Sequence, residues 1–459
     1  MGRPNVILII ADQHRWDCTG YAGNPDLRTP NLDALAAHGV NFSQAVCQFP
    51  LSVPSRSTIL SGQYPSTHGV RTNRDGLPTN AITLPCLLHD AGYNTACVGK
   101  MHFNPARADY GFDVMRLAEQ DGNGRYEDDY HRWLEGQGAV DRIDIWDQVD
   151  RDSAPKRYWD TFGAMPSNLS EAQHSTTWIG NMAVRFIQSA REPFFLTIGF
   201  IKPHHPFDPP APWHRLYDPN ALTLPEGWRL PVPPEDAKRG GFFDPSTMTE
   251  ACFRRVLAYY YASISHLDHQ VGRLLATLTA RGFTNNLFVY CADHGDYMGQ
   301  HGLIIKHDRP YDSLLRVPLV VAGLVGQRRG KSDPAMAQLT DVMPTMLDAA
   351  GLDIPGSVEG RSLVPQLRRA RAPLRSHATC EGPHDIRVIR NQRHKLVESS
   401  DEDLRALYDL EHDPHEFRNL YGHPDAAARQ AQLSKAMALD VQYTSTKPSP
   451  RAAKRKAKP

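Results

Sequence analysis

Residues 5–11 are Asn5-Val6-Ile7-Leu8-Ile9-Ile10-Ala11, an almost wholly apolar run. A strand with apolar side chains on both faces is typical of a parallel sheet that helices cover on each side. The run is too short to cross a membrane, and no small-residue cleavage site follows it. It therefore predicts a core strand, and with it a cytoplasmic α/β protein.

Similar buried strands alternate with helices over the first 370 residues. Strands are predicted at 94–98, 194–201, 286–291 and 317–322, and helices at 30–38, 84–91, 252–279 and 344–350. This alternation predicts a large mixed, mostly parallel sheet sandwiched by helices. In such folds the active site lies at the carboxyl ends of the strands.

Changes of pattern divide the chain into a catalytic α/β domain over 1–370 and two further parts. Residues 122–240 are richer in Trp, Pro and charge, and we expect them to be insertion-like and to shape the pocket. A small C-terminal antiparallel α+β subdomain is predicted over 371–440, with strands at 387–390, 395–397 and 406–409 and a helix at roughly 426–439. Residues 441–459 hold six basic and no acidic side chains, and are predicted to be a disordered tail.

Composition argues against several classes of function. The 459 residues carry 51 Lys and Arg against 51 Asp and Glu, so no overall field favours nucleic acid. No stretch approaches a transmembrane length. The seven cysteines include no C-x-x-C pair, which predicts free thiols rather than a disulfide framework or a structural zinc site. The expected partners therefore include neither nucleic acid nor a membrane.

Polar side chains gather at the ends of the predicted strands. Asp12 directly follows the first strand, and Asp293 and His294 follow the strand that ends at Cys291. Two carboxylates and an imidazole suit a divalent cation, although an isolated Asp is as often a turn residue. Cations beside a metal suit an anion with several oxygens. Such cations lie at other strand ends or in nearby loops, at Lys100, His102, His204, His205 and Lys306.

One further stretch carries a family resemblance. Residues 52–62 are Ser52-Val53-Pro54-Ser55-Arg56-Ser57-Thr58-Ile59-Leu60-Ser61-Gly62. They resemble the sulfatase signature, which is Cys or Ser, any residue, Pro, Ser and Arg, then a short helix that ends in Gly. Further matches include Ala11-Asp12-Gln13, Gly99-Lys100-Met101-His102, Pro203-His204-His205-Pro206-Phe207, Asp293-His294-Gly295 and Tyr408-Asp409-Leu410. The chain is identified as a member of the sulfatase family, and an alkaline phosphatase-like fold is expected.

The resemblance implies a formylglycine nucleophile, made by oxidation of the residue at position 52. Its hydrated form, held by one divalent metal ion, attacks the sulfur of a sulfate ester and expels the alcohol. The second hydroxyl then loses its proton, and sulfate leaves by C–O cleavage. In this scheme His204 protonates the leaving oxygen, and His102 is the candidate base for the second hydroxyl.

The implied roles cover eleven residues. The metal ligands would be Asp12, Gln13, Asp293 and His294. The catalytic residues would be Ser52, Arg56, Lys100, His102, His204 and Lys306, and the substrate-binding residues would be Asn73, Lys100, His204 and Lys306.

Three positions depart from the commoner family pattern. Gln13 stands where many members have a second aspartate, and His294 stands where many have asparagine, so calcium and manganese are both candidates. Ser52 stands where cysteine is commoner. Three readings of Ser52 stay open. It is a serine that a radical maturase oxidises to formylglycine, or a Cys-to-Ser substitution within the signature that the formylglycine-generating enzyme reads. In the third reading it is an unmodified serine that acts as an alkoxide nucleophile.

Three functions are therefore in competition. The first is hydrolysis of aryl, choline or carbohydrate sulfate monoesters. The second is hydrolysis of phosphonate monoesters or phosphodiesters, against which the Lys100 and His102 pair argues. The third is binding of a sulfated ligand by an inactive or unmodified Ser52 form. The expected partners are a small or oligosaccharide sulfate ester and a maturase, and a homo-oligomer is left open.

Overall fold

The computed structural model describes the chain except for residues 1, 121, 240, 242, 370–373 and 446–459. An eight-stranded sheet of order β4-β3-β5-β1-β6-β7-β2-β8 forms its centre. The strands are β1 (Asn5–Asp12), β2 (Gly39–Phe42), β3 (Asn94–Gly99), β4 (Val114–Leu117), β5 (Phe194–Pro203), β6 (Asn286–Ala292), β7 (Leu319–Ala322) and β8 (Lys331–Asp333).

The pairing confirms a mixed, mostly parallel sheet. Strands β4, β3, β5, β1 and β6 are paired in parallel, whereas β7 runs antiparallel to both of its neighbours, β6 and β2. Four of the five predicted core strands thus share one direction. The fifth, predicted at 317–322, is present but reversed.

Strand β1 shows why the opening run is apolar throughout. All eight of its residues are buried. Val6 and Leu8 pack into the core on one face of the sheet, whereas Ile7 and Ile9 pack into the core on the other. A strand buried on both faces needs apolar side chains at successive positions, because neighbouring side chains point to opposite faces.

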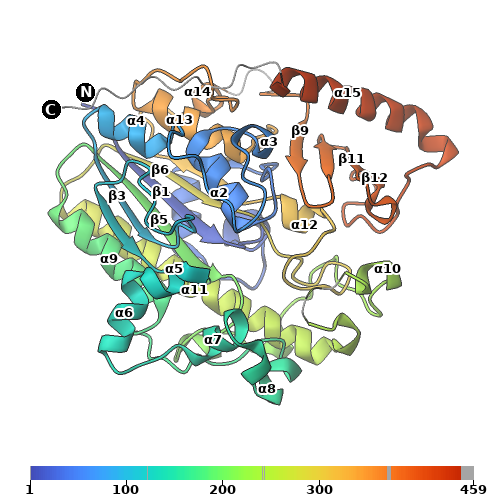
Figure 1. The fold of residues 1–459 in the computed structure, drawn as a ribbon, viewed down its shortest axis with the longest axis horizontal. Coiled ribbons are helices and arrows are strands. Elements are labelled where there is room, and N and C mark those ends of the chain that lie inside the picture. Colours follow the sequence, from blue (N-terminus) through green and yellow to red (C-terminus); the bar gives the residue numbers. More distant parts are fainter. Residues whose placement is uncertain (1, 121, 240, 242, 370–373, 446–459) are drawn as a thin grey trace.

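Helices cover both faces (Figure 1). The core that contains Ile7 and Ile9 also contains side chains of α1 (Pro30–Ala37), α9 (Ser175–Ser189) and α11 (Glu250–Ala280). The opposite core contains side chains of α2 (Ser52–Ser61), α4 (Leu84–Asp90) and α13 (Val342–Ala349). None of the helices in the described ranges is both long and apolar enough to cross a membrane.

Most of the remaining helices are short. They are α3 (Pro65–His68), α5 (Gly122–Glu127), α6 (Asp129–Gly136), α7 (Arg142–Gln148), α8 (Lys156–Asp160), α10 (Pro234–Ala237), α12 (Asp312–Leu315) and α14 (Val364–Arg368). Residues 122–240 include helix α9 and strand β5 of the central sheet. The region predicted to be insertion-like therefore contains two elements of the central α/β fold.

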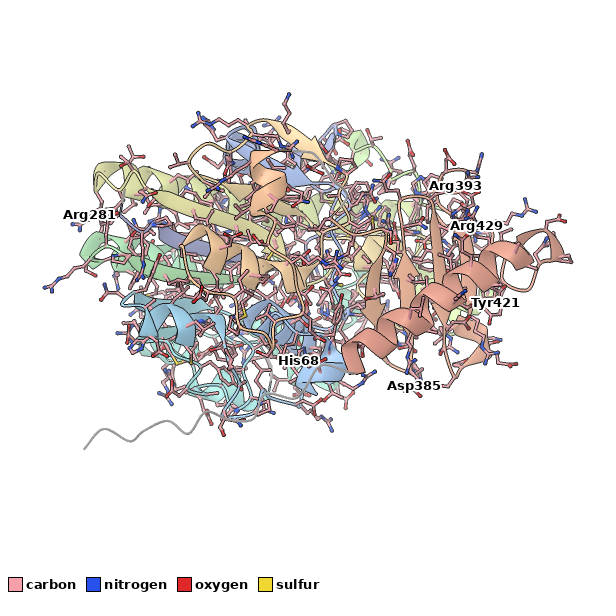
Figure 2. All side chains as sticks on the ribbon, turned by 90° about the horizontal axis from the view of Figure 1, so that it is seen from above. His68, Arg281, Asp385, Arg393, Tyr421 and Arg429 are labelled. Atoms are coloured by element: carbon pink, nitrogen blue, oxygen red, sulfur yellow. The ribbon has the colours of Figure 1, made fainter. Side chains whose placement is uncertain are left out.

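A second, antiparallel sheet of order β12-β11-β10-β9 confirms the predicted C-terminal subdomain. Its strands are β9 (Ala378–Glu381), β10 (Arg387–Arg390), β11 (His394–Glu398) and β12 (Ala406–Asp409), and β9 was not predicted. Helix α15 (Ala427–Ser445) packs on this sheet through Leu433 and Met437. Figure 2 shows this part, with Arg393, Tyr421 and Arg429, at the end of the molecule opposite Arg281.

The tail prediction needs a correction at its start. Helix α15 continues to Ser445, so residues 441–445 are helical rather than part of a disordered tail. No glycine or proline interrupts the chain between the predicted end at Leu439 and Ser445, so the helix can continue over these residues. The rest of the predicted tail lies outside the described residues.

Candidate active site

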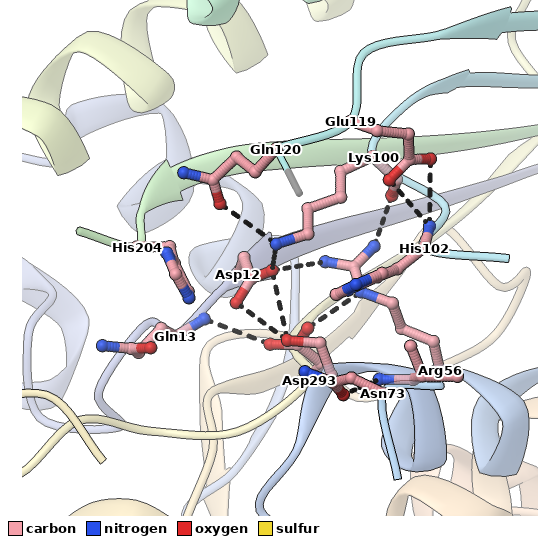
Figure 3. Close-up of polar contacts among 12 residues, drawn as sticks. Asp12, Gln13, Arg56, Asn73, Lys100, His102, Glu119, Gln120, His204 and Asp293 are labelled. Atoms are coloured by element: carbon pink, nitrogen blue, oxygen red, sulfur yellow. Dashed lines mark hydrogen bonds and ion pairs between the residues drawn. The ribbon is translucent and has the colours of Figure 1, made fainter. Parts of the chain in front are cut away.

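The polar residues predicted at strand ends lie together at one edge of the central sheet (Figure 3). Asp12 ends β1, Lys100 follows β3, His204 follows β5 and Asp293 follows β6. These four strands are parallel neighbours, so their carboxyl ends meet at the same edge. The sheet itself, rather than any local motif, brings these side chains into contact.

Asp12, Asp293 and His294 form a cluster that could hold a metal ion. All three are buried, and one ligand atom from each lies within 4.8 Å of the others. The Nδ1–H of His294 donates to the Gly295 carbonyl at 2.9 Å, which leaves the Nε2 lone pair facing Asp12 Oδ1 at 3.7 Å. A carbonyl that fixes the tautomer in this way is typical of metal-binding histidines. Burial lowers the pKa of His294 to about 4, so the imidazole is neutral, as a ligand must be. The donor set fits one divalent cation.

Gln13 lies at the edge of this cluster with its side chain engaged by other groups. Its Oε1 accepts a hydrogen bond from Lys306 Nζ at 2.7 Å, and its Nε2 donates to Asp296 Oδ2 at 2.5 Å. Its backbone N–H donates to Asp293 Oδ1 at 3.1 Å. In this arrangement the amide oxygen of Gln13 binds Lys306, and Gln13 contacts the Asp293 carboxylate through its backbone N–H.

Ser52 and Arg56 reach the same carboxylates from helix α2. Ser52 is the first residue of the helix, and its Oγ lies 3.3 Å from Asp12 Oδ1 and 3.2 Å from His294 Nε2. Arg56 follows one turn later, so it lies on the same face. Its Nε donates to Asp293 Oδ2 at 2.8 Å, and its Nη2 contacts Asp12 Oδ2 at 3.4 Å. Burial opposes its charge, but Asp293 and Asp12 raise the pKa of Arg56 overall.

Two lysines and a histidine complete the cluster. Lys100 Nζ lies 2.6 Å from Asp12 Oδ2, and Lys306 Nζ lies 3.0 Å from His204 Nε2. Burial alone would raise the pKa of Asp12, but the positive charges of Lys100 and Arg56 hold it well below its usual range. Burial and Lys306 hold the pKa of His204 well below its usual value. The site therefore combines an ionised carboxylate with cations and a neutral imidazole.

Asn73 and His102, also predicted as site residues, lie close to the cluster. Asn73 Oδ1 accepts a hydrogen bond from the backbone N–H of Val53, the residue after Ser52, at 3.2 Å. His102 has a left-handed backbone, with φ of 57°, and its N–H donates to the Glu119 carboxylate at 3.0 Å. Figure 3 shows both residues within the same group of polar contacts.

The structure adds residues that the sequence did not indicate. Glu119 holds the backbone of His102, and Asp296 holds the amide of Gln13. Gln120 accepts a hydrogen bond from Lys100. Asp296 comes directly after the Asp293-His294-Gly295 motif, and this position could have marked it as a site residue. Glu119 and Gln120 follow the short strand β4, which no sequence pattern predicted.

Comparisons with known proteins agree with this geometry. A family model described as Sulfatase matches residues 4–352, and one described as N-sulphoglucosamine sulphohydrolase, C-terminal, matches residues 299–442. An arylsulfatase of Clostridium perfringens is 33% identical over 96% of this chain and 95% of its own length. A choline-sulfatase of Rhizobium meliloti is 29% identical over 94% of this chain and 85% of its own.

Among solved structures, the phosphonate monoester hydrolase of Agrobacterium radiobacter superposes with a TM-score of 0.81. The two chains are 26% identical, and the match covers 96% of each. The alkaline phosphatase-like fold expected from the sequence is thereby confirmed. The chain belongs to the sulfatase family, within the alkaline phosphatase superfamily, and is a sulfuric ester hydrolase.

Proposed function

We propose that this protein hydrolyses sulfate monoesters with a nucleophile derived from residue 52. The position of Ser52 carries the proposal, because its Oγ lies against both Asp12 and His294. Asp12, Asp293 and His294 would hold one divalent metal ion. When bound, such an ion supplies Lewis acidity and orients a nucleophile. An imidazole among the donors favours Mn²⁺ over Ca²⁺, because calcium prefers oxygen ligands alone.

The cations of the site would hold the ester. The ammonium groups of Lys100 and Lys306 would bind sulfate oxygens, whose negative charge grows in the transition state. Arg56 would hold the Asp12 and Asp293 carboxylates in place beside residue 52. Lys100 and Arg56 are buried and Lys306 is partly buried, so their attraction for an anion is stronger than in water.

His204 is proposed to protonate the leaving alcohol. Its Nδ1–H donates to the His205 carbonyl at 2.6 Å, so a proton carried on Nε2 is the one available for transfer. The low pKa of His204 makes its protonated form a strong acid towards the leaving oxygen. His102 is proposed as the base that later takes a proton from the nucleophile. Maturation of Ser52 to formylglycine by a maturase is part of the proposal.

A second candidate is hydrolysis of phosphonate monoesters or phosphodiesters. The observation that favours it is the TM-score of 0.81 with a phosphonate monoester hydrolase over nearly the whole chain. A phosphonate monoester anion also carries oxygens that the two lysines could bind. The reacting atom is sulfur in the first candidate and phosphorus in the second. The two candidates therefore predict that different model substrates are hydrolysed faster.

The test joins mass spectrometry with turnover. Peptide mass spectrometry of protein from its own host should show the loss of two hydrogens at Ser52. The same protein should release sulfate from 4-nitrophenyl sulfate, lose this activity with a chelator and regain it with Mn²⁺. Ser52→Ala is the matched variant, and hydrolysis that survives in it would contradict the proposal. Faster hydrolysis of a phenylphosphonate monoester than of the sulfate would instead establish the second candidate.

A further inference from the structure

The side chain of Gln120 lies behind the proposed sulfate-binding groups. It follows β4 and is 1% exposed. Its Oε1 accepts a hydrogen bond from Lys100 Nζ at 3.1 Å, as Figure 3 shows. Its Nε2 donates to Asp144 Oδ1 at 3.0 Å and to the His205 carbonyl at 3.1 Å. Both amide hydrogens and the amide oxygen therefore have partners.

These partners fix the orientation of the amide. A lysine ammonium only donates hydrogen bonds, whereas a carboxylate and a carbonyl only accept them. A reversed Gln120 would place N–H groups against Lys100 and its oxygen against two acceptors. Asp144, on helix α7, is itself held in place by an ion pair with Arg125.

The His205 carbonyl links this amide to the proposed proton donor. It accepts the Nδ1–H of His204 at 2.6 Å and the Nε2–H of Gln120 at 3.1 Å. A carbonyl oxygen has two lone pairs, so it can accept both hydrogen bonds. The rings of His204 and His205 also stack, with centroids 4.2 Å apart. Gln120 thus contacts Lys100 directly and reaches His204 through one shared acceptor.

We propose that Gln120 is a positioning residue that holds Lys100 and His204 as one unit. Of the three N–H groups of Lys100, Asp12 takes one and Gln120 takes another, which directs the third. The shared carbonyl holds the Nδ1–H of His204, so that in the imidazolium form the Nε2–H is the proton available to the leaving oxygen. Gln120 adds no charge of its own, so its contribution is geometric. The inference rests on the proposed roles of Lys100 and His204.

The test compares Gln120→Met with the wild-type holoenzyme. Methionine has a similar volume but cannot make the three hydrogen bonds. We expect kcat/KM to fall about 100-fold for phenyl sulfate, whose poor leaving group needs the acid, and only about tenfold for 4-nitrophenyl sulfate. The inhibition constant of inorganic sulfate should rise several-fold, because Lys100 is displaced. The proposal needs both changes. Equal losses on the two esters, or an unchanged inhibition constant, would overturn it.

Two further measurements separate this inference from its alternatives. Gln270→Met removes a buried amide of the same 1% exposure from helix α11, and we expect it to change neither the leaving-group dependence nor sulfate inhibition. A crystal structure of Gln120→Met tests the inference without any measurement of activity. If Lys100 Nζ and the His204 ring keep their wild-type positions in it, the inference fails. If the wild-type holoenzyme hydrolyses neither ester, the proposed function fails instead.

Discussion

His294 is the residue through which the choice of metal can be changed without removing the site. Its Nε2 faces Asp12, and its tautomer is set by the Gly295 carbonyl. We predict that His294→Asn shifts the retained metal from Mn²⁺ towards Ca²⁺ by about tenfold, because an amide oxygen replaces the imidazole nitrogen. The measurement is metal content by mass spectrometry after dialysis against equal concentrations of both ions.

The control is His266→Asn, which removes a buried imidazole whose Nε2 lies 2.9 Å from Thr177 Oγ1, outside the cluster. This variant should retain the wild-type ratio of the two metals. An unchanged ratio in His294→Asn would mean that the imidazole does not coordinate the ion, and the metal assignment would fail.

Residues of the site differ in how far the sequence predicts them. Asp12 and Asp293 are predictable because each polar side chain directly ends an apolar run, and a parallel sheet brings such ends together. Gln120 and Asp144 are not, since their function depends on a contact between the segment after β4 and the short helix α7 that no periodic pattern marks. Sequence reasoning therefore reaches the groups that face the substrate sooner than the groups that hold them.

At the scale of elements, β10 of the C-terminal sheet is tied to α12 by buried charges. Arg390 donates to Asp312 at 2.6 Å and 3.0 Å, and Lys395 lies 3.3 Å from the same carboxylate. We predict that Arg390→Met lowers the free energy of unfolding by about 3 to 5 kcal/mol, because Asp312 is left buried without its main partner. Urea denaturation followed by fluorescence measures the change.

Arg393 offers a matched comparison on the loop between β10 and β11, at the periphery in Figure 2. Its side chain is 49% exposed and pairs with Asp409 at 3.2 Å. Arg393→Met should lower the free energy of unfolding far less than Arg390→Met does, because exposed ion pairs contribute little. Equal costs for the two arginine variants would refute a structural role for the buried network.

Long elements are predictable from their own residues, whereas some short strands are not. Helix α11 was predicted at 252–279 and is observed at Glu250–Ala280, because apolar side chains that include Leu267 and Val271 recur along it with a helical period. Strands β2 and β9 have only four residues each, and they lack the adjacent pair of large apolar residues that marks the equally short β10 and β12. Their strand conformation is set by the partners that they meet in the folded chain.

At the scale of the whole molecule, the class of fold is predictable and the strand order is not. Alternating strands and helices indicate a parallel sheet covered on both faces. The reversal of β7 between β6 and β2 depends on long-range packing, because nothing within its own apolar run encodes direction. The position of the site is predictable even so, because the strand ends that form it belong to the parallel strands β3, β5, β1 and β6.

The free energy of unfolding should depend on pH because several histidines are buried. His266 is the clearest single case. It is fully buried, and burial, with repulsion from His269 and Arg273, lowers its pKa to about 3. The unfolded chain binds this proton at higher pH than the folded chain does. Stability from His266 is therefore present above about pH 6.5 and is lost as the pH falls towards the folded pKa.

We predict that the wild-type protein loses roughly 2 kcal/mol more free energy of unfolding than His266→Gln does between about pH 7 and about pH 5. Urea denaturation of both proteins at each pH measures this difference. Thr177→Val is the control, because it removes the hydrogen bond to the ring but keeps the titrating imidazole, so its pH dependence should follow the wild type. Parallel pH dependences for wild type and His266→Gln would show that the ring takes up its proton equally in both states, which burial of a neutral imidazole forbids.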